Sequence, residues 1–243
     1  MPGTERVRSV GARRRKTRTG VVLTADMIVD TALRLIDAPG GDKLSVRRLG
    51  AELGADPTAV YRYFRDMDAL LLALADRLIG DAFAEFVPRE HWADSLRDLA
   101  ASLRRSMRLH PRLAHLRAIR VTAGPHEMRV VDTGIGIMLS AGFAPADAVR
   151  HYRDFVDTVL AVAAVDAAEL TEEQEAAEQE AWSRVYTSLP ADGYPNVHLV
   201  REHLPSMYNS AFPGTIDKLI DALVQAAPAE VSGTRTSSPP GRS

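Results

Sequence analysis

Residues 44–64 read LSVRRLGAELGADPTAVYRYF, and this stretch carries start and stop signals for two short helices. Ser45 suits the N-terminal cap of the first helix and Gly54 suits its end, because serine accepts hydrogen bonds from free amides and glycine tolerates a left-handed backbone. Asp56 followed by Pro57 is a second start signal, since proline loses no hydrogen bond at the first helical position. The stretch therefore predicts two short helices joined by a tight turn.

The second of these helices has an apolar face and a polar face. Val60 and Phe64 fall together on one side, which we expect to face the core. The side chains expected to point away are Thr58, Ala59, Arg62 and Tyr63. A helix that reads the DNA major groove needs this arrangement, with one face anchored and short or planar donors turned toward base edges. The pattern predicts a helix-turn-helix, and an ordinary helical hairpin with a solvated arginine is the alternative.

Charge is distributed unevenly along the chain. The 243 residues carry a net charge of −2, yet residues 1–22 hold seven basic residues and one acidic residue, and the part beyond residue 65 is acidic. A polycationic arm just before a DNA-binding helix pair can lie along phosphates or enter the minor groove, although a solubilising disordered tail is the alternative. A nucleoid-type architectural protein would need basic charge over its whole body, so the acidic remainder disfavours that class.

Composition excludes several other classes. The chain has no cysteine, which excludes disulfides and thiol catalysis. No run of some twenty apolar residues occurs, and the basic N-terminus is not followed by an apolar segment, so we expect no membrane span and no signal peptide. The 46% of hydrophobic residues is enough for a sizeable core. These features predict a cytoplasmic protein.

The rest of the chain is predicted to be helical, giving an all-α fold. Apolar positions at helical spacing, broken by Pro and Gly, predict helices at 66–86, 92–109, 127–139, 146–165, 197–208 and 213–227, with an acidic segment at 169–180. The predicted organisation is a disordered basic arm at 1–22, a helix-turn-helix DNA-binding domain at 23–70, a larger helical domain at 71–227 and a disordered tail at 228–243.

The first domain resembles the N-terminal domain of the TetR family of transcriptional regulators. The matching pieces are IVDTAL at 28–33, LSVRRLGAELGA at 44–55, VYRYF at 60–64 and DALL at 68–71. Met67 stands where the family usually has a phosphate-binding lysine, and Ala59 where a threonine is common. The resemblance implies a three-helix domain that binds operator DNA. The expected DNA-binding residues are Thr24, Lys43, Arg47, Thr58, Ala59, Tyr61, Arg62 and Tyr63, of which Thr24, Lys43, Arg47 and Tyr61 would hold phosphates.

The larger domain resembles the C-terminal ligand-binding and dimerisation domain of the tetracycline-repressor branch. The similar features are the helix that starts at Trp92, the segment RVTAGP at 120–125, the turn LSAGF at 139–143 and the Val/Ala-rich helix that follows. The resemblance implies a homodimer in which the helices 146–165 and 213–227 pack with their copies. The expected interface residues are Val156, Leu160, Ala163, Ile216, Leu219, Ile220 and Leu223, and intrachain packing is the alternative for each.

The same resemblance bears on the effector. Arg120 and Phe83 stand where the tetracycline branch has histidines, so we expect no metal-chelated ligand and no cofactor. The seven histidines show no metal-ligand spacing. We expect an organic effector with an apolar body and an acidic or carbonyl group near Arg120. The expected ligand-binding residues are Phe83, Phe86, Met107, Arg120, Met138, Tyr152 and Phe155, for which core packing is the alternative.

An enzyme is the competing class. Gly134-Ile135-Gly136 is half of a dinucleotide fingerprint, but it lies in a helical context without a preceding strand. Glu172, Glu173, Glu175 and Glu178 are explained more simply by a solvated acidic segment than by a paired-carboxylate site. The sequence therefore predicts a dimeric, ligand-responsive DNA-binding regulator, a repressor released by a small organic effector. The alternatives are a helical enzyme and an effector-independent DNA-binding protein.

Overall fold

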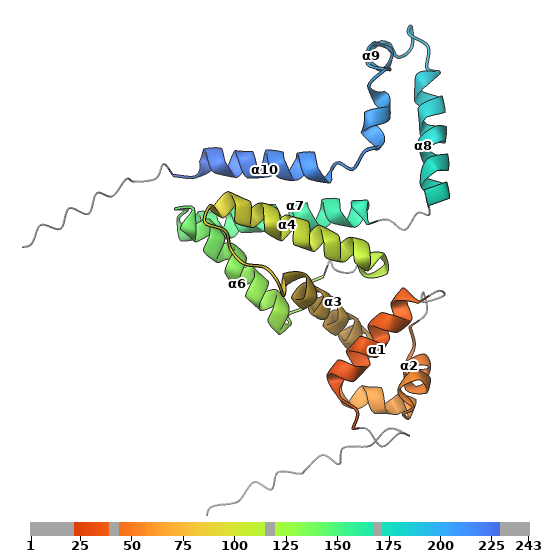
Figure 1. Cartoon of the computed structure of the whole chain (residues 1–243), viewed down its shortest axis with the longest axis vertical. Helices are drawn as coiled ribbons and strands as arrows, with labels where there is room; N and C mark the ends of the chain where they lie inside the picture. Colours follow the sequence, from red (N-terminus) through yellow and green to blue (C-terminus); the bar gives the residue numbers. More distant parts are fainter. Residues whose placement is uncertain (1–21, 39–43, 115–119, 168–171, 229–243) are drawn as a thin grey trace, which may run out of the picture. The chain divides into compact units, whose positions relative to one another are not determined.

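The computed structural model describes residues 22–38, 44–114, 120–167 and 172–228 (Figure 1). Across these ranges the chain is helical and contains no β-strand, which confirms the all-α prediction. Contacts divide it into two compact units. The first holds the residues up to Leu78 together with the segment Arg120–Gly124, and the second holds Ile79–Ile119 and the residues from Pro125 onward.

The first unit is built on α1 (Ala25–Asp37), α2 (Val46–Leu53), the 3-10 helix η1 (Pro57–Arg62) and the first part of α3 (Met67–Phe83). α1 packs on α2, and α2 packs on η1. The core of the unit consists of fully buried aliphatic side chains, namely Ile28, Ala32, Leu49, Val60, Leu70 and Leu74. Burial of these side chains supplies most of the stability of a domain of this size.

The helix ends of the first unit confirm the predicted caps. The Ser45 hydroxyl accepts from the Arg48 amide at 3.2 Å, and Gly54 ends α2 with φ of 59°, in the left-handed region. The Asp56 carboxylate accepts from the Thr58 amide at 2.8 Å. The Asp66 carboxylate likewise accepts from the Ala69 amide at 2.7 Å and caps α3. Because each cap satisfies amides that a helix start leaves unpaired, the chain direction through the turn is fixed locally.

Gly50 allows α2 and η1 to approach closely. A Cβ atom at this position would lie 2.9 Å from the Pro57 Cα and 3.0 Å from the Ala55 carbonyl oxygen. Real Cβ contacts with backbone atoms are longer, so any larger residue would push η1 away from α2. Gly50 is not among the residues predicted to shape the turn, although close packing of two helices requires a small residue at their contact.

The second unit is built on four helices that pack on one another (Figure 1): α4 (Trp92–Leu109), α6 (Pro125–Ser140), α7 (Pro145–Asp166) and α10 (Phe212–Ala226). α4 contacts the other three, and its predicted bounds of 92–109 agree with the structure. The side chains at the centre of this core include Leu96, Leu99, Met107, Met138, Phe155 and Ile220.

Gly134 serves helix packing in this core. A Cβ atom there would lie 2.0 Å from Cε2 of the Tyr152 ring, so α6 and α7 can approach only with glycine at this position. Gly136, two residues later, has no such neighbour within 4 Å. Both Gly134 and Gly136 lie within α6. A dinucleotide fingerprint needs its glycines in a turn that holds the pyrophosphate, and a helix interior provides no such turn.

The chain between α7 and α10 forms a further helical hairpin. α8 (Glu172–Thr187) packs against α9 (Pro195–Leu199) and the 3-10 helix η2 (Leu204–Tyr208). Of the acidic segment predicted at 169–180, residues 172–180 form the first part of α8 and residues 169–171 lie outside the described residues. The helix predicted at 197–208 is divided into two short ones. No helix in the described residues is both long and apolar enough to span a membrane.

Candidate nucleic-acid interface and ligand site

The α2–η1 surface, defined by Arg47, Tyr61 and Arg62, lies on the exposed side of the turn. Tyr61 is 47% exposed and both arginines are exposed. Within the described part of the chain, neither arginine forms an ion pair. Two cations and a phenol on a rigid, capped turn are suited to contact base edges and phosphates.

Ala59 requires a correction, because it faces the core. It is 6% exposed and buried beside Val60. The 3.6-residue period of an α-helix predicts an exposed Ala59, whereas η1 is a 3-10 helix with three residues per turn. Ala59 therefore anchors η1 and offers no side chain to DNA.

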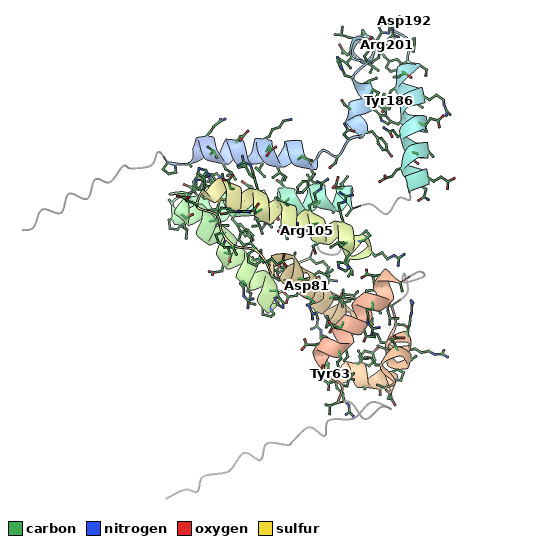
Figure 2. The ribbon with its side chains drawn as sticks, viewed as in Figure 1. Tyr63, Asp81, Arg105, Tyr186, Asp192 and Arg201 are labelled. Atoms are coloured by element: carbon green, nitrogen blue, oxygen red, sulfur yellow. The ribbon has the colours of Figure 1, made fainter. Side chains whose placement is uncertain are left out.

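Thr58 and Tyr63 are exposed but already engaged within the first unit, and Tyr63 is labelled in Figure 2. The Thr58 hydroxyl donates to the Asp56 carboxylate at 2.6 Å, so it belongs to the helix cap. The Tyr63 hydroxyl donates to the Leu23 carbonyl, which ties the end of η1 to the segment that precedes α1. Both side chains position the α2–η1 surface through these bonds.

The remaining residues expected to bind phosphate divide into two groups. Thr24 is exposed at the N-terminus of α1, where its hydroxyl accepts from the Met27 amide at 3.2 Å. A helix N-terminus presents free amides that favour anions. Lys43 and the basic arm lie outside the described residues.

Arg120 requires a second correction, since the structure places it in the first unit in an ion pair. Its guanidinium donates to both carboxylate oxygens of Asp68, through Nη1 to Oδ1 and through Nη2 to Oδ2 at 2.7 Å. The hydrogen bond from Arg120 lowers the pKa of the Asp68 carboxyl, and Asp68 in turn raises the pKa of Arg120. A guanidinium that is already matched by a two-point carboxylate contact is a structural clamp and a poor receptor for an anionic effector.

The segment Arg120–Gly124 is held at a second point on α3. The Thr122 hydroxyl donates to Oδ1 of Asp76 at 3.1 Å, and Asp76 is buried. A Cβ atom at Gly124 would lie 2.1 Å from the Asp76 Cγ, so glycine is needed for this approach. The segment is therefore an integral part of the first unit, although the helices that flank it in sequence belong to the second.

Four of the expected ligand residues are packed into the core of the second unit. Met107, Met138 and Phe155 have no exposed surface and Tyr152 is 6% exposed. Burial raises the pKa of the Tyr152 hydroxyl to about 12, with a smaller contribution from the charge of Glu127. Core packing, the alternative considered for these residues, accounts for their burial.

Two adjoining cavities lie along α4 in the second unit. The larger, of about 740 Å³, lies between the end of α3, the connection at 84–91 and α4, and Phe86 is one of its lining residues. The smaller, of about 450 Å³, lies between α4 and Phe212. Both are lined by Ala101, Arg105 and Leu109, and we call them together the α4 groove. Figure 2 labels Asp81 on α3 and Arg105 on α4, which both line the larger cavity.

Phe83 and Phe86 lie side by side at the α3 end of this unit. Their rings stack with centroids 4.6 Å apart, and both side chains are half-buried. Among the seven side chains expected to bind a ligand, Phe86 is the one that lines the α4 groove. Arg105 is not among the residues predicted to bind a ligand, although Arg104, Arg105 and Arg108 form a basic cluster in the sequence of a predicted helix.

The residues expected at a dimer interface divide by burial. Ala163, Ile216, Ile220 and Leu223 are buried within one chain, so intrachain packing explains them. Val156, Leu160 and Leu219 are only half-buried. Val149 on α7 is 54% exposed and Val224 on α10 is 44% exposed. Apolar surface therefore remains on both helices after the single chain has folded.

In the portion of the chain that the structure describes, no three His, Asp or Glu side chains are grouped as a metal site would require. The exposed glutamates of α8 are spread along one helix, and Arg184 pairs with Glu180 at 2.7 Å. This is the pattern of a solvated helix surface.

Two family models match the chain. One, described as bacterial regulatory proteins of the tetR family, matches residues 28–74. The other, described as the tetracyclin repressor-like C-terminal domain, matches residues 87–218, which is more than half of the chain. The first match covers the α2–η1 turn, and the second covers α4 and the part of the α4 groove from Val87 onward.

Curated relatives and solved structures agree with these matches. An HTH-type transcriptional regulator of Saccharopolyspora erythraea is 32% identical over 133 residues, which is 55% of this chain and 56% of that protein. The tetracycline repressor protein class A from transposon 1721 of Escherichia coli is 31% identical over 134 residues, or 53% of this chain and 60% of that protein. These alignments thus span less than two thirds of each relative. ActR of Streptomyces coelicolor, solved in complex with actinorhodin, is 28% identical with a TM-score of 0.75, covering 84% of this chain and 97% of ActR.

Proposed function

Because the chain belongs to the TetR family of bacterial regulatory proteins, we propose that it is a ligand-responsive DNA-binding transcriptional regulator. It would repress by occupying an operator and leave that operator when a small organic effector binds. The observation that carries the proposal is the α2–η1 surface, in which two arginines and a tyrosine stand on a capped, closely packed turn and have no carboxylate partner among the described residues.

The division of tasks on this surface follows from exposure and chemistry. Arg62 would contact a base edge, because a guanidinium can donate two hydrogen bonds to guanine in the major groove. Arg47, Tyr61 and Thr24 would contact phosphates, with Lys43 and the basic arm adding further positive charge. Ala59 and Val60 anchor η1, so a change at either would act through stability.

The effector and the dimer are part of the same proposal. ActR has been solved with actinorhodin and with (S)-DNPA, and the E. coli relative is named a tetracycline repressor. We infer that this chain also responds to a small organic molecule and acts as a homodimer in the cytoplasm. Val156, Leu160 and Leu219 would contribute to the dimer interface, because they keep exposed apolar surface on α7 and α10.

We propose no catalytic role for the chain. The relatives are transcriptional regulators, Gly134 serves packing of α6 against α7, and the glutamates of α8 lie along a solvated helix.

A ligand-responsive regulator needs two states, one that binds DNA and one that does not. A shift from mostly bound to mostly released DNA requires the ligand to bind the second state more tightly by several kcal/mol.

Selection of bound sequences from a random DNA pool tests the proposal. We expect one enriched sequence that binds at least about a thousandfold more tightly than random DNA at physiological salt. Equal affinity for selected and random DNA would contradict the proposal. A panel of small organic molecules is then tested for release of the selected DNA, which separates a ligand-responsive regulator from an effector-independent DNA-binding protein.

A further inference from the structure

The last turns of α4 carry a cluster of three arginines, of which one forms an ion pair within the described residues. Arg104, Arg105 and Arg108 lie within five residues of one another on this helix. Nε of Arg104 pairs with Oδ2 of Asp166 at 2.6 Å, and its guanidinium lies 4.8 Å from the centre of the Phe212 ring. Like charges three or four residues apart repel one another on a helix. A partner that neutralises Arg105 and Arg108 would relieve this repulsion.

Arg105 and Arg108 form no ion pair in the described part of the chain. The Arg105 guanidinium donates to the neutral hydroxyl of Ser102 at 3.4 Å. The charge of Arg108 contributes to lowering the pKa of Asp166, whose carboxylate is bound by Arg104. Both side chains are exposed at the α4 groove, since Arg105 lines both cavities and Arg108 lines the smaller one. Two cations are therefore available to a ligand in the groove.

Apolar side chains line part of the groove. Leu109 and Ala101 are shared by both cavities, Phe86 and Val87 line the larger and Phe212 lines the smaller. The larger cavity also has charged and hydroxyl groups in its lining, among them Asp81, Glu85, Asp98 and Ser102. Its volume of about 740 Å³ falls within the range of roughly 300–1,000 Å³ that small-molecule sites occupy. A pocket that combines apolar surface with charged groups suits a ligand with an apolar body and one charged end.

The carboxylates around the larger cavity set the orientation of such a ligand. Nε of Arg89 pairs with Oδ2 of Asp98 at 2.5 Å, so the charge of Asp98 is balanced. Asp81 and Glu85 line the cavity from the end of α3 and its continuation, away from α4 in sequence. The lining of the larger cavity thus includes the carboxylates of Asp81 and Glu85 on the α3 side and the guanidinium of Arg105 on α4. Asp81 and Arg105 are labelled in Figure 2.

We propose that the α4 groove binds an organic anion, with an apolar body over Leu109 and Phe86 and a carboxylate or phosphate held by Arg105 and Arg108. Hydroxyl groups at the other end of the ligand would donate to Asp81 and Glu85. This assigns to Arg105 the role first expected of Arg120, whose charge Asp68 already balances. The inference names the effector class and in that sense rests on the proposed function, but binding of the anion requires no DNA.

Two fluorescent probes with the same aromatic body test the proposal. The first is 8-anilinonaphthalene-1-sulfonate, which is an anion, and the second is N-phenyl-1-naphthylamine, which is neutral. The affinity of each is measured by titration with the full chain. We expect Arg105→Gln and Arg108→Gln each to weaken binding of the anion about tenfold, as for loss of a charge-assisted hydrogen bond, with the neutral probe nearly unaffected.

Matched variants keep the result interpretable. Arg129→Gln removes an exposed arginine of α6 that lines neither cavity, and it should leave the affinity for both probes unchanged. Arg105→Lys should restore most of the affinity for the anion, because it returns the charge. If Arg105→Gln proves unstable, Arg108→Gln provides the same comparison, since Arg108 lies on the exposed side of α4.

The headgroup is identified by displacement of the anionic probe. Displacement by 1-naphthoate or 1-naphthyl phosphate supports the proposal, and the tighter of the two identifies the preferred acid. Equal displacement by the neutral 1-naphthol, or an equal loss of the anionic probe in Arg129→Gln and Arg105→Gln, would overturn it. A failure of this kind would leave DNA selection untouched, so it is distinguishable from failure of the proposed function.

Discussion

The α2–η1 surface and the α4 groove both present arginines that form no ion pair within the described residues, but the two sites differ in shape. Arg47 and Arg62 stand on an exposed turn that is fixed by caps and by the close approach at Gly50. Arg105 and Arg108 border cavities whose lining includes both apolar and charged side chains. Exposed cations on a rigid surface match an extended polyanion, whereas cations beside apolar surface in a cavity match a small organic anion.

Arg120 is a third arginine to compare, and it shows that the surroundings of an arginine determine its role. Its guanidinium is matched by both oxygens of Asp68, and its neighbour Thr122 binds the buried Asp76. The charge is used inside the first unit to hold the segment Arg120–Gly124 on α3. The presence of an arginine at a family position is therefore not enough to assign it to a ligand.

The largest effect is expected from breaking the packing that supports the α2–η1 surface. Gly50→Val places side-chain atoms against the Pro57 backbone and should destabilise the first unit by about 2 kcal/mol or more, with loss of operator binding. Probe binding in the α4 groove should remain. Chemical unfolding and DNA binding measure the two effects.

Gly136→Ala is the matched control for this change, because no neighbour lies within 4 Å of its Cβ position. It should leave both DNA binding and stability unchanged or slightly improved, since alanine favours a helix over glycine. Equal behaviour of the two variants would contradict the assignment of close packing to Gly50.

Removal of the basic arm is expected to give the next largest effect. Deletion of residues 1–20 removes seven basic residues and should lower the slope of log K against log salt by roughly 0.9 per lost phosphate contact. The affinity for the selected operator is measured over a series of salt concentrations. An unchanged slope would assign the arm no contact with DNA.

A smaller effect is expected from one base contact. Arg62→Ala should weaken binding to the selected operator by about 1–3 kcal/mol and binding to random DNA by less, because a base contact contributes only at the correct sequence. Arg184→Ala, which removes an exposed arginine of α8, serves as the control. Equal losses on both DNAs would reassign Arg62 to a phosphate.

The smallest effect is expected at the exposed clamp between Arg120 and Asp68. Its contribution to stability should be fully present above pH 3.8, the ordinary pKa of the carboxyl, and should disappear as the pH falls through the lowered pKa of the folded chain. Arg120→Ala and Asp68→Asn should each lower the melting temperature at pH 7, and the double variant should lower it no further than either change alone. Additive losses would show that the two groups act independently.

The local features of the first unit could be predicted because each depends on residues a few positions apart. The caps at Ser45, Asp56 and Asp66 join a side chain to an amide two or three residues later. The left-handed end at Gly54 is equally local. The bounds of α4 followed from its apolar spacing and from the His110-Pro111 pair that ends it.

The features that could not be predicted depend on contacts between distant parts of the chain. Asp68 lies 52 residues from Arg120, and no residue near Arg120 in the sequence indicates that Asp68 is its partner. Helical spacing alone cannot separate a buried Met107 from a side chain that lines a cavity, since both are apolar. The predicted exposure of Ala59 is wrong because η1, a helix of six residues that begins at Pro57, has 3-10 geometry.

The most direct test of these assignments is a crossed measurement of two affinities in two variants. Binding to the selected operator and to 8-anilinonaphthalene-1-sulfonate is measured for Arg62→Gln and for Arg105→Gln. We predict that Arg62→Gln weakens operator binding alone and that Arg105→Gln weakens probe binding alone. If either variant lost both affinities, or if the two losses were exchanged, the separation of a DNA-binding surface at η1 from an anion site on α4 would be contradicted.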